Sequence, residues 1–226
     1  MRLLIFDTET TGLPKSRQSA SVEPNIWPHI VSISWVILDT DLIEKKRSYI
    51  IKPLGWEIPD EVVKIHGITT EKANAEGKEL SSVIGEFLAE SYDVLVAHNL
   101  EFDLNVLYNA IKWDLELPFT TIKKKTLCTM ELSRDICNLK TTFNRPKAPK
   151  LKELYQYTFH RLPEESQLHN SLYDVLILTE IIQHCGELRL KMNLSTIQVK
   201  PVLKYVSKKD ASRVLSIDLR ETVKDQ

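Results

Sequence analysis

The sequence predicts an α/β domain built around one buried central strand. Residues 3–6 form an uninterrupted apolar run, which is typical of a strand covered on both faces. Residues 30–38 alternate between apolar and polar side chains, as expected for a strand with one covered face. From residue 80 onward, helical and strand patterns alternate, which favours βα units over an all-β or all-α fold.

The other elements follow in order along the chain. We expect residues 46–52 to form a strand that, like residues 30–38, runs antiparallel to the first strand. Residues 14–29 contain three prolines and are expected to form a surface loop. A short strand is expected at residues 94–97. Helical periodicity predicts helices at residues 80–90, 99–111, 126–137, 150–159 and 171–185.

Composition narrows the class of protein. The 226 residues, 42% of them hydrophobic, suffice for a packed core without a disulfide or a structural metal. No apolar run approaches the ~20 residues of a membrane span, and the N-terminus lacks a signal-peptide pattern. The three cysteines form no CxxC pair, which favours a reducing compartment. We therefore expect a cytoplasmic protein without membrane association.

Charge is distributed unevenly although the net charge is only −1. Residues 123–161 hold ten basic and three acidic side chains, and residues 189–226 hold nine and four. Such basic segments on an acidic body fit an enzyme with a polyanionic substrate. The candidate contacts for phosphates are the cluster Lys123, Lys124 and Lys125 together with Arg145, Lys147 and Lys150. Ordinary solvated surface charge is the alternative.

Two carboxylates follow the central strand directly. Side chains alternate along a strand, so Asp7 and Glu9 point to one side, about 6.6 Å apart along the chain, and Thr8 points away. The alternative is a polar turn, because Asp, Thr and Gly are common turn residues.

Two further acids lie on apolar helix faces. Asp103 is in phase with Val106 and Leu107 if Asn99 caps its helix, and Asp174 is in phase with Ile177. An unpaired charge on a buried face is costly, so each acid should meet a cation or a metal. Oxygen ligands without a Cys or His cluster favour Mg²⁺ or Mn²⁺, and two such ions would support in-line hydrolysis of a phosphodiester.

Two histidines accompany these acids. His169 is expected on the loop before an Asn170 cap, where it would lean over the same cavity and take a proton from an attacking water. A lone loop histidine is the alternative for His169. His98, at the end of a strand, is expected to be structural rather than a ligand.

Three motifs carry a family resemblance. DTETTGL at residues 7–13, HNLEFD at residues 98–103 and HNSLYD at residues 169–174 resemble, in this order, the three exonuclease motifs of the DEDDh (DnaQ-like) 3′-to-5′ exonucleases. The resemblance covers residues 1 to about 187 and implies an RNase H-like fold, with a central mixed five-stranded sheet flanked by helices. Residues 1–187 would form the exonuclease domain and residues 188–226 a C-terminal extension of unknown role. Ser171 stands where the family usually has Ala.

The resemblance also implies roles for individual residues. Asp7, Glu9, Asp103 and Asp174 would hold two Mg²⁺ or Mn²⁺ ions, and His169 would be the general base. The substrate-binding residues it implies are Thr10, Thr11, Gly12, Leu13, His66, Asn99 and Phe102, with Leu13 as a wedge beside the last base.

The predicted function is a metal-dependent 3′-to-5′ exonuclease that releases nucleoside 5′-monophosphates, with DNA as the favoured substrate. Its expected partner is the single-stranded or frayed 3′ end of a nucleic acid, and a polymerase or repair protein is a candidate partner. The alternatives are an RNA-trimming exoribonuclease and a non-catalytic nucleic-acid-binding protein on the same fold.

Overall fold

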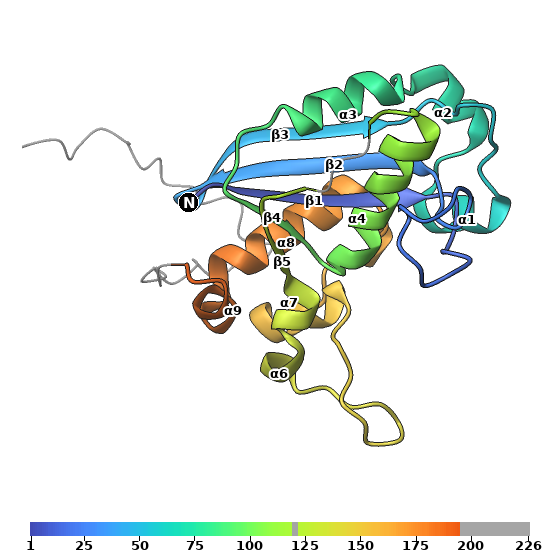
Figure 1. Cartoon of the computed structure of the whole chain (residues 1–226). Coiled ribbons are helices and arrows are strands. Elements are labelled where there is room, and N and C mark those ends of the chain that lie inside the picture. The colour runs from blue at the N-terminus through green and yellow to red at the C-terminus, as the bar shows by residue number, and fades with distance from the viewer. Residues whose placement is uncertain (119–121, 195–226) are drawn as a thin grey trace, which may run out of the picture. The chain divides into compact units, whose positions relative to one another are not determined.

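A mixed five-stranded sheet organises the computed structural model, which describes residues 1–118 and 122–194. The strand order is β3-β2-β1-β4-β5 (Figure 1). The central strand β1 (Leu3–Thr10) is antiparallel to β2 (Ile30–Asp39) and parallel to β4 (Val94–Ala97). The edge strands are β3 (Leu42–Ile50), antiparallel to β2, and β5 (Lys125–Cys128), parallel to β4. The predicted mixed five-stranded sheet and the central position of residues 3–6 are confirmed.

The outer strands differ from the predictions in two places. β3 pairs with β2 alone and not with β1, and it begins at Leu42 because Thr40 and Asp41 form a tight turn with positive φ angles of 45° and 68°. Residues 126–128, expected to begin a helix, belong to β5. Such a short segment has no decisive periodicity, and pairing with the open edge of β4 determines its conformation.

Helices flank the sheet and connect its strands. The α-helices are α1 (Asp60–His66), α2 (Thr70–Glu76), α3 (Leu80–Leu88), α4 (Leu100–Asn109), α5 (Thr129–Leu132), α6 (Arg134–Cys137), α7 (Leu151–Phe159), α8 (Ser171–His184) and α9 (Gly186–Lys191), with a π-helical turn η1 (Ala110–Asp114) and a 3₁₀ turn η2 (Glu165–Gln167). α1 and α2 were not predicted. Residues 14–29 contain no helix or strand, as expected. None of the helices in the described part of the chain has the length and apolar character needed to cross a membrane.

The alternation along β1 divides the core into two layers. Leu4 and Phe6 pack with α3 and α4, whereas Leu3 and Ile5 pack with α7 and α8 on the other face (Figure 1). The same alternation continues beyond the apolar run. Residues 7 and 9 therefore face the α8 side of the sheet, and residue 8 faces the α4 side.

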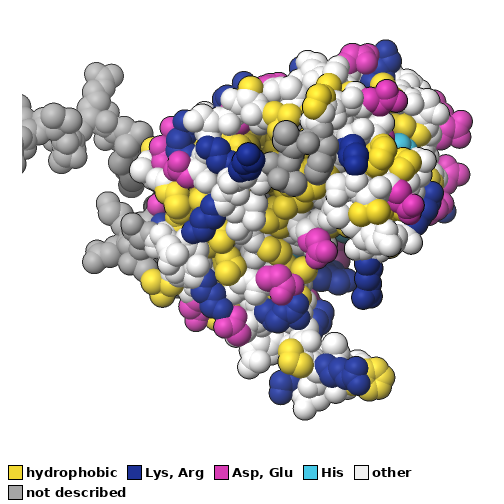
Figure 2. All heavy atoms as spheres, viewed as in Figure 1, with side chains coloured by type: hydrophobic (Ala, Val, Ile, Leu, Met, Phe, Trp, Pro, Cys, Tyr) yellow, Lys and Arg dark blue, Asp and Glu magenta, His cyan; other side chains and the backbone are white. Residues whose placement is uncertain are grey.

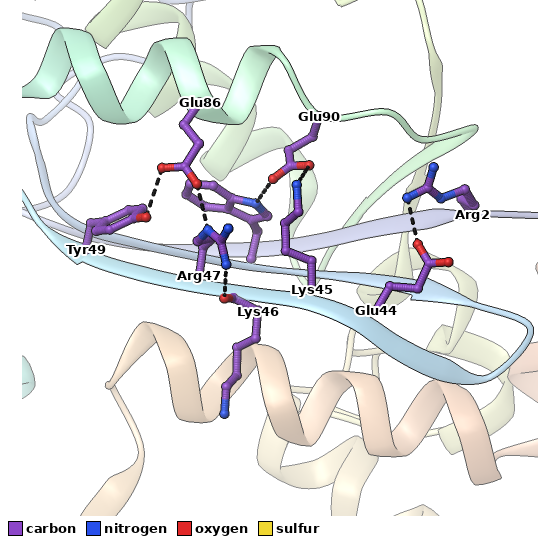
Figure 3. A network of polar contacts seen from close by, with 9 residues as sticks. Arg2, Glu44, Lys45, Lys46, Arg47, Tyr49, Glu86 and Glu90 are labelled. Atoms are coloured by element: carbon purple, nitrogen blue, oxygen red, sulfur yellow. Dashed lines mark hydrogen bonds and ion pairs between the residues drawn. The ribbon is translucent and has the colours of Figure 1, made fainter.

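Polar contacts fix α3 on the outer strands. The Arg47 Nε donates to the carboxylate of Glu86 at 2.6 Å, and the Lys45 Nζ donates to Glu90 at 2.7 Å (Figure 3). Arg47 and Glu86 are both partly exposed, so the pair contributes little net stability. These acids have cationic partners, unlike those described below.

The chain after α8 packs back onto the second core. Leu188 and Met192 are buried with the residues of α8, so the first part of the predicted extension belongs to the packed body. Residues 195–226 of that extension lie outside the described residues.

Candidate active site

The candidate site lies where β1 extends beyond the end of its parallel neighbour, β4. β4 pairs with β1 only over Leu3–Ile5, so the later part of β1 has no strand beside it on that edge. The pairing with β2 is also interrupted by an irregularity between Glu9 and Thr10. Irregularities of this kind are common beside functional sites because they redirect side chains.

Three carboxylates converge at this point. Asp7 and Glu9 from β1 and Asp174 from α8 each place a carboxylate oxygen within 4.8 Å of the others. Asp174 lies in the first turn of α8, whose N-terminus is capped by Asn170: the Asn170 Oδ1 accepts from the backbone N–H of Leu172 at 3.1 Å. The predicted cap and the predicted same-side arrangement of Asp7 and Glu9 are therefore present.

Asp103 reaches the same strand from the opposite face of the sheet. The residue is only 3% exposed, and its Oδ1 accepts from the Thr8 backbone N–H at 3.1 Å and from the Thr8 Oγ1 at 2.8 Å. Asp103 lies close enough to Asp7 that its charge raises the pKa of Asp7. Asn99 occupies the N-cap position of α4, but it has φ of 74° and makes no capping hydrogen bond, contrary to the prediction.

Burial perturbs all four acids, and repulsion from neighbouring acids adds to it at Asp7 and Glu9. Burial, followed by repulsion from Asp103, Asp174 and Glu9, raises the pKa of Asp7 well above its ordinary value. Burial and the charges of Asp174 and Asp103 raise the pKa of Glu9 to about 8. Burial also raises the pKa of Asp103 and of Asp174, against hydrogen bonds from Thr8 and His169 that lower it.

The cluster has the chemical character of a cation site. Within residues 1–118 and 122–194, no Lys or Arg forms an ion pair with any of the four acids. The Asp174 Oδ1 is buried and has no hydrogen-bond partner there. Carboxylate oxygens without a compensating charge are the ligands that Mg²⁺ and Mn²⁺ prefer, so these residues fit divalent ions.

His169 lies at the mouth of the cluster. Its φ is 63°, and its backbone N–H donates to the Asp174 Oδ2 at 3.3 Å. It lines a cavity of about 210 Å³ together with Asp174 and Lys150, and also a larger one of about 550 Å³ together with His66. His169 therefore lies beside Asp174 and borders both cavities.

His66, at the end of α1, borders the wider cleft. Its Nδ1 accepts from the Ile68 backbone N–H at 3.1 Å, and its Nε2 is buried without a partner among the described residues. Burial lowers the pKa of His66, so the neutral ring is favoured. The Thr10 backbone acts against this effect and raises the pKa, so the His66 ring lies beside the segment that ends β1.

The segment after β1 is held in a fixed turn. The Thr10 Oγ1 donates to the Gly12 carbonyl at 2.8 Å, and Thr11 exchanges two hydrogen bonds with the backbone of His29. Gly12 has φ of 153°, which residues with a Cβ rarely adopt. Leu13 is 84% exposed beside a small cavity of about 130 Å³.

The remaining predicted residues are Asn99, Phe102 and His98. Asn99 is exposed, and the Phe102 ring packs against Trp27 with ring centroids 5.7 Å apart. The His98 Nε2 lies 3.0 Å from the Pro149 carbonyl and its Nδ1 lies 3.1 Å from the Thr129 Oγ1. Burial lowers the pKa of His98 to about 4, so the ring is neutral and its contacts are structural.

Two supporting features escaped the sequence analysis. The first is Thr8, whose backbone and hydroxyl hold Asp103. The second is a buried hydroxyl cluster, in which the Ser171 Oγ lies 3.0 Å from the Ser32 Oγ and 2.8 Å from the Ser34 Oγ. Its signal was present in the polar side of residues 30–38 and in the unusual serine of the third motif.

The lysine cluster considered as a phosphate contact lies far from the acids. Lys125 is paired with Val94 in the sheet, and Val94 is paired with Leu3. Asp7 lies four residues further along β1, about 13 Å at the usual rise of a strand. Lys123, Lys124 and Lys125 therefore belong to the opposite end of the sheet.

Comparisons with known proteins agree with this geometry. A family model, RNase_T, described as Exonuclease, matches residues 4–182. Exonuclease X in complex with 5′ overhanging duplex DNA is similar at 25% identity and a TM-score of 0.51, over 80% of this chain and 90% of that one. No curated protein matched the sequence.

A second solved structure shares the fold. E. coli exonuclease I in a zinc-bound complex with single-stranded DNA is 17% identical with a TM-score of 0.62, over 83% of this chain and 40% of that one. The chain thus spans about 40% of the length of exonuclease I. The similarity to these exonucleases confirms the predicted RNase H-like fold.

Proposed function

This chain belongs to the RNase_T exonuclease family, and on that basis we propose that it removes nucleoside 5′-monophosphates from the 3′ end of a nucleic-acid strand in a reaction that needs divalent metal ions. The observation that carries the proposal is the convergence of Asp7, Glu9 and Asp174 within 4.8 Å, with His169 beside them. A catalytically silent member of the family would have no need to retain so costly a cluster of unpaired acids.

Asp7, Glu9, Asp103 and Asp174 are the residues that would hold the ions. When bound, two Mg²⁺ or Mn²⁺ ions supply positive charge at the attacking and leaving oxygens of the phosphodiester. The hydrogen bonds from Thr8 occupy the Asp103 Oδ1 and orient its other oxygen. Binding of cations would also bring all four acids to their ionised forms at neutral pH.

His169 would accept the proton of the attacking water. The water oxygen forms a bond to phosphorus, and the bond from phosphorus to the 3′ oxygen of the neighbouring nucleotide breaks. That oxygen takes up a proton from solvent and leaves as a hydroxyl group. The positive φ of His169 and the hydrogen bond from its backbone N–H to Asp174 fix its backbone, and the residue lines both cavities. Histidine is the side chain that most often serves as a general base.

The turn at Thr10, Thr11, Gly12 and Leu13 would bind the terminal nucleotide. The hydrogen bonds to His29 pre-organise its backbone, and the exposed Leu13 side chain is available to pack beside a base. His66, Asn99 and Phe102 would complete the walls of the same groove. Binding of a terminal nucleotide by this turn would favour cleavage from a free end over internal cleavage.

DNA is the favoured substrate, because both similar structures described above are exonucleases in complex with DNA. RNA is the second candidate, because the matching family model bears the name of a ribonuclease. A single-stranded or frayed 3′ end would fit the site in either case. A polymerase or a repair protein would be a suitable partner for such an activity.

The decisive experiment follows 5′-labelled and 3′-labelled strands in parallel. We expect the 5′-labelled strand to give a ladder that shortens from the 3′ end in Mg²⁺ or Mn²⁺, and no cleavage in excess EDTA. Matched DNA and RNA strands, single-stranded and duplex, would identify the substrate. Rapid cutting of a circular single strand would indicate an endonuclease, and full activity in EDTA would exclude the metal-dependent mechanism.

A further inference from the structure

An ordered arm projects from the body between α6 and α7. Residues 139–147 fold back on themselves through a bridge between Lys140 and Pro146 and a hydrogen bond from the Lys147 N–H to the Leu139 carbonyl (Figure 1). At its tip the Thr141 N–H donates to the Arg145 carbonyl at 2.8 Å. These contacts define a small hairpin.

The tip of the arm exposes an aromatic side chain. Phe143 is 84% exposed, which places a large apolar ring in water without support from the body. Isolated exposed apolar residues are common, but this one lies at the tip of a projecting element, between Thr142 and Asn144. Figure 2 shows the projecting lobe with hydrophobic and Lys or Arg side chains on the visible face.

The arm and the segment that follows it carry only positive charge. Residues 136–152 contain five Lys or Arg and no Asp or Glu. Two of them have acidic partners: Lys147 pairs with Glu153, and Lys152 pairs with Glu165. Lys140 and Arg145 are exposed and form no ion pair within the described parts of the chain. These two cations flank Phe143.

The base of the arm is connected to the acidic site. The Pro149 carbonyl lies 3.0 Å from the His98 Nε2, and His98 begins the motif that supplies Asp103. Lys150 lines the cavity of about 210 Å³ that also contains His169 and Asp174. A strand whose 3′ end reaches the acids therefore has a basic route toward the arm.

We propose that the arm is a second contact for the substrate strand, in which the Phe143 ring stacks on a base and Lys140 and Arg145 bind phosphates 5′ of the cleaved nucleotide. An aromatic ring between cations is the arrangement that binds single strands without sequence preference, because every base has a π face and every linkage has a phosphate. DNA and RNA share both features. The proposal rests on the proposed function, since it takes the strand from the acidic site to the arm.

The test measures binding of 5′-fluorescein-labelled dT16 and rU16 by anisotropy, with Ca²⁺ in place of Mg²⁺. Phe143→Ala should weaken binding roughly 5- to 100-fold, as loss of one stacked base does, and Phe143→Trp should restore it. Leu190→Ala, at another exposed apolar residue, on α9, should bind like the wild type.

The contribution of Lys140 and Arg145 is tested against a control variant that removes the same number of positive charges elsewhere. Replacing Lys140 and Arg145 with Ala should lower the slope of log K against log salt by about 1.4, or about 0.7 for each phosphate contact. Replacing Lys123 and Lys125, at the other end of the sheet, should leave the slope unchanged. Equal slopes for the two double variants would overturn the proposal.

Activity on a small substrate separates this proposal from the proposed function. The p-nitrophenyl ester of thymidine 5′-monophosphate is too short to reach the arm, so arm variants should hydrolyse it at the wild-type rate. Failure of the wild type to hydrolyse it would count against the proposed function and not against the arm. If Phe143→Ala binds both oligonucleotides with wild-type affinity, the arm contact is refuted. If that variant is also a monomer where the wild type is a dimer, the arm serves self-association.

Discussion

Replacement of Glu9 by Gln should stabilise the metal-free protein, and the gain should grow with pH. The folded protein holds the pKa of Glu9 at about 8, against an ordinary value of 4.5, mainly because the group is buried. The unfolded chain therefore releases this proton at lower pH than the folded protein does. Stability contributed by the protonated form is complete below pH 4.5, and it is lost as the pH rises toward 8.

The magnitude follows from the two pKa values. At about 1.4 kcal/mol per pH unit, ionisation of Glu9 destabilises the fold by under about 1 kcal/mol at pH 5 and by about 3 kcal/mol at pH 7. Gln has nearly the same shape and no charge, so it removes this cost. For a domain of this size each kcal/mol changes Tm by roughly 2–4 °C. We expect Tm to rise by roughly 6–12 °C at pH 7 and by at most about 4 °C at pH 5.

Thermal unfolding in excess EDTA measures both values. Glu23→Gln is the control, because Glu23 is an exposed loop residue, and its Tm should match the wild type at both pH values. Added Mg²⁺ should raise the Tm of the wild type at pH 7 more than that of Glu9→Gln, because the ion compensates a charge that the variant lacks. An equal change in Tm at pH 5 and pH 7 would contradict this account of the acidic cluster.

Three other substitutions test the supporting residues. His169→Ala should lower kcat by about 10² to 10⁴ with little change in KM, and an unchanged kcat at neutral pH would make His169 a structural residue. Thr8→Val removes one hydrogen bond to Asp103 and should raise the Mg²⁺ concentration needed for half-maximal activity about tenfold. Titration of activity with Mg²⁺ measures this, and kcat should recover at saturating Mg²⁺. Ser171→Ala should lower the free energy of unfolding, measured in urea, by about 1 kcal/mol because Ser34 loses a buried partner, and it should leave kcat unchanged. A large loss of activity would show that the hydroxyl acts in catalysis.

The acids were predictable because their placement depends on local periodicity. Asp7 and Glu9 share a side of β1 because strands alternate, and Asp174 faces the sheet because it lies on the apolar stripe of α8. The position of His169 before the Asn170 cap follows from capping alone. These inferences needed no knowledge of which strands pair.

Features that depend on strand pairing were not predictable in the same way. The assignment of residues 126–128 to β5 and the pairing of β3 with β2 alone both require the strand order. The same is true of Lys123–Lys125, which are close in sequence to the second and third motifs and yet lie at the far end of the sheet. The contact between Thr8 and Asp103 joins residues 95 positions apart in the sequence.

The short β4 explains how one site can draw acids from both faces. Because β4 pairs only with Leu3–Ile5, the edge of β1 beyond it is open, and the Thr8 N–H binds the Asp103 carboxylate. Asp7 and Glu9 meet Asp174 on the other face, so four like charges gather around a few residues of one strand. The apolar layers on both faces of β1 supply the stability that this arrangement costs. A cation that binds only the folded cluster returns part of that stability, so folding, metal binding and the ionisation of Glu9 are linked in this protein.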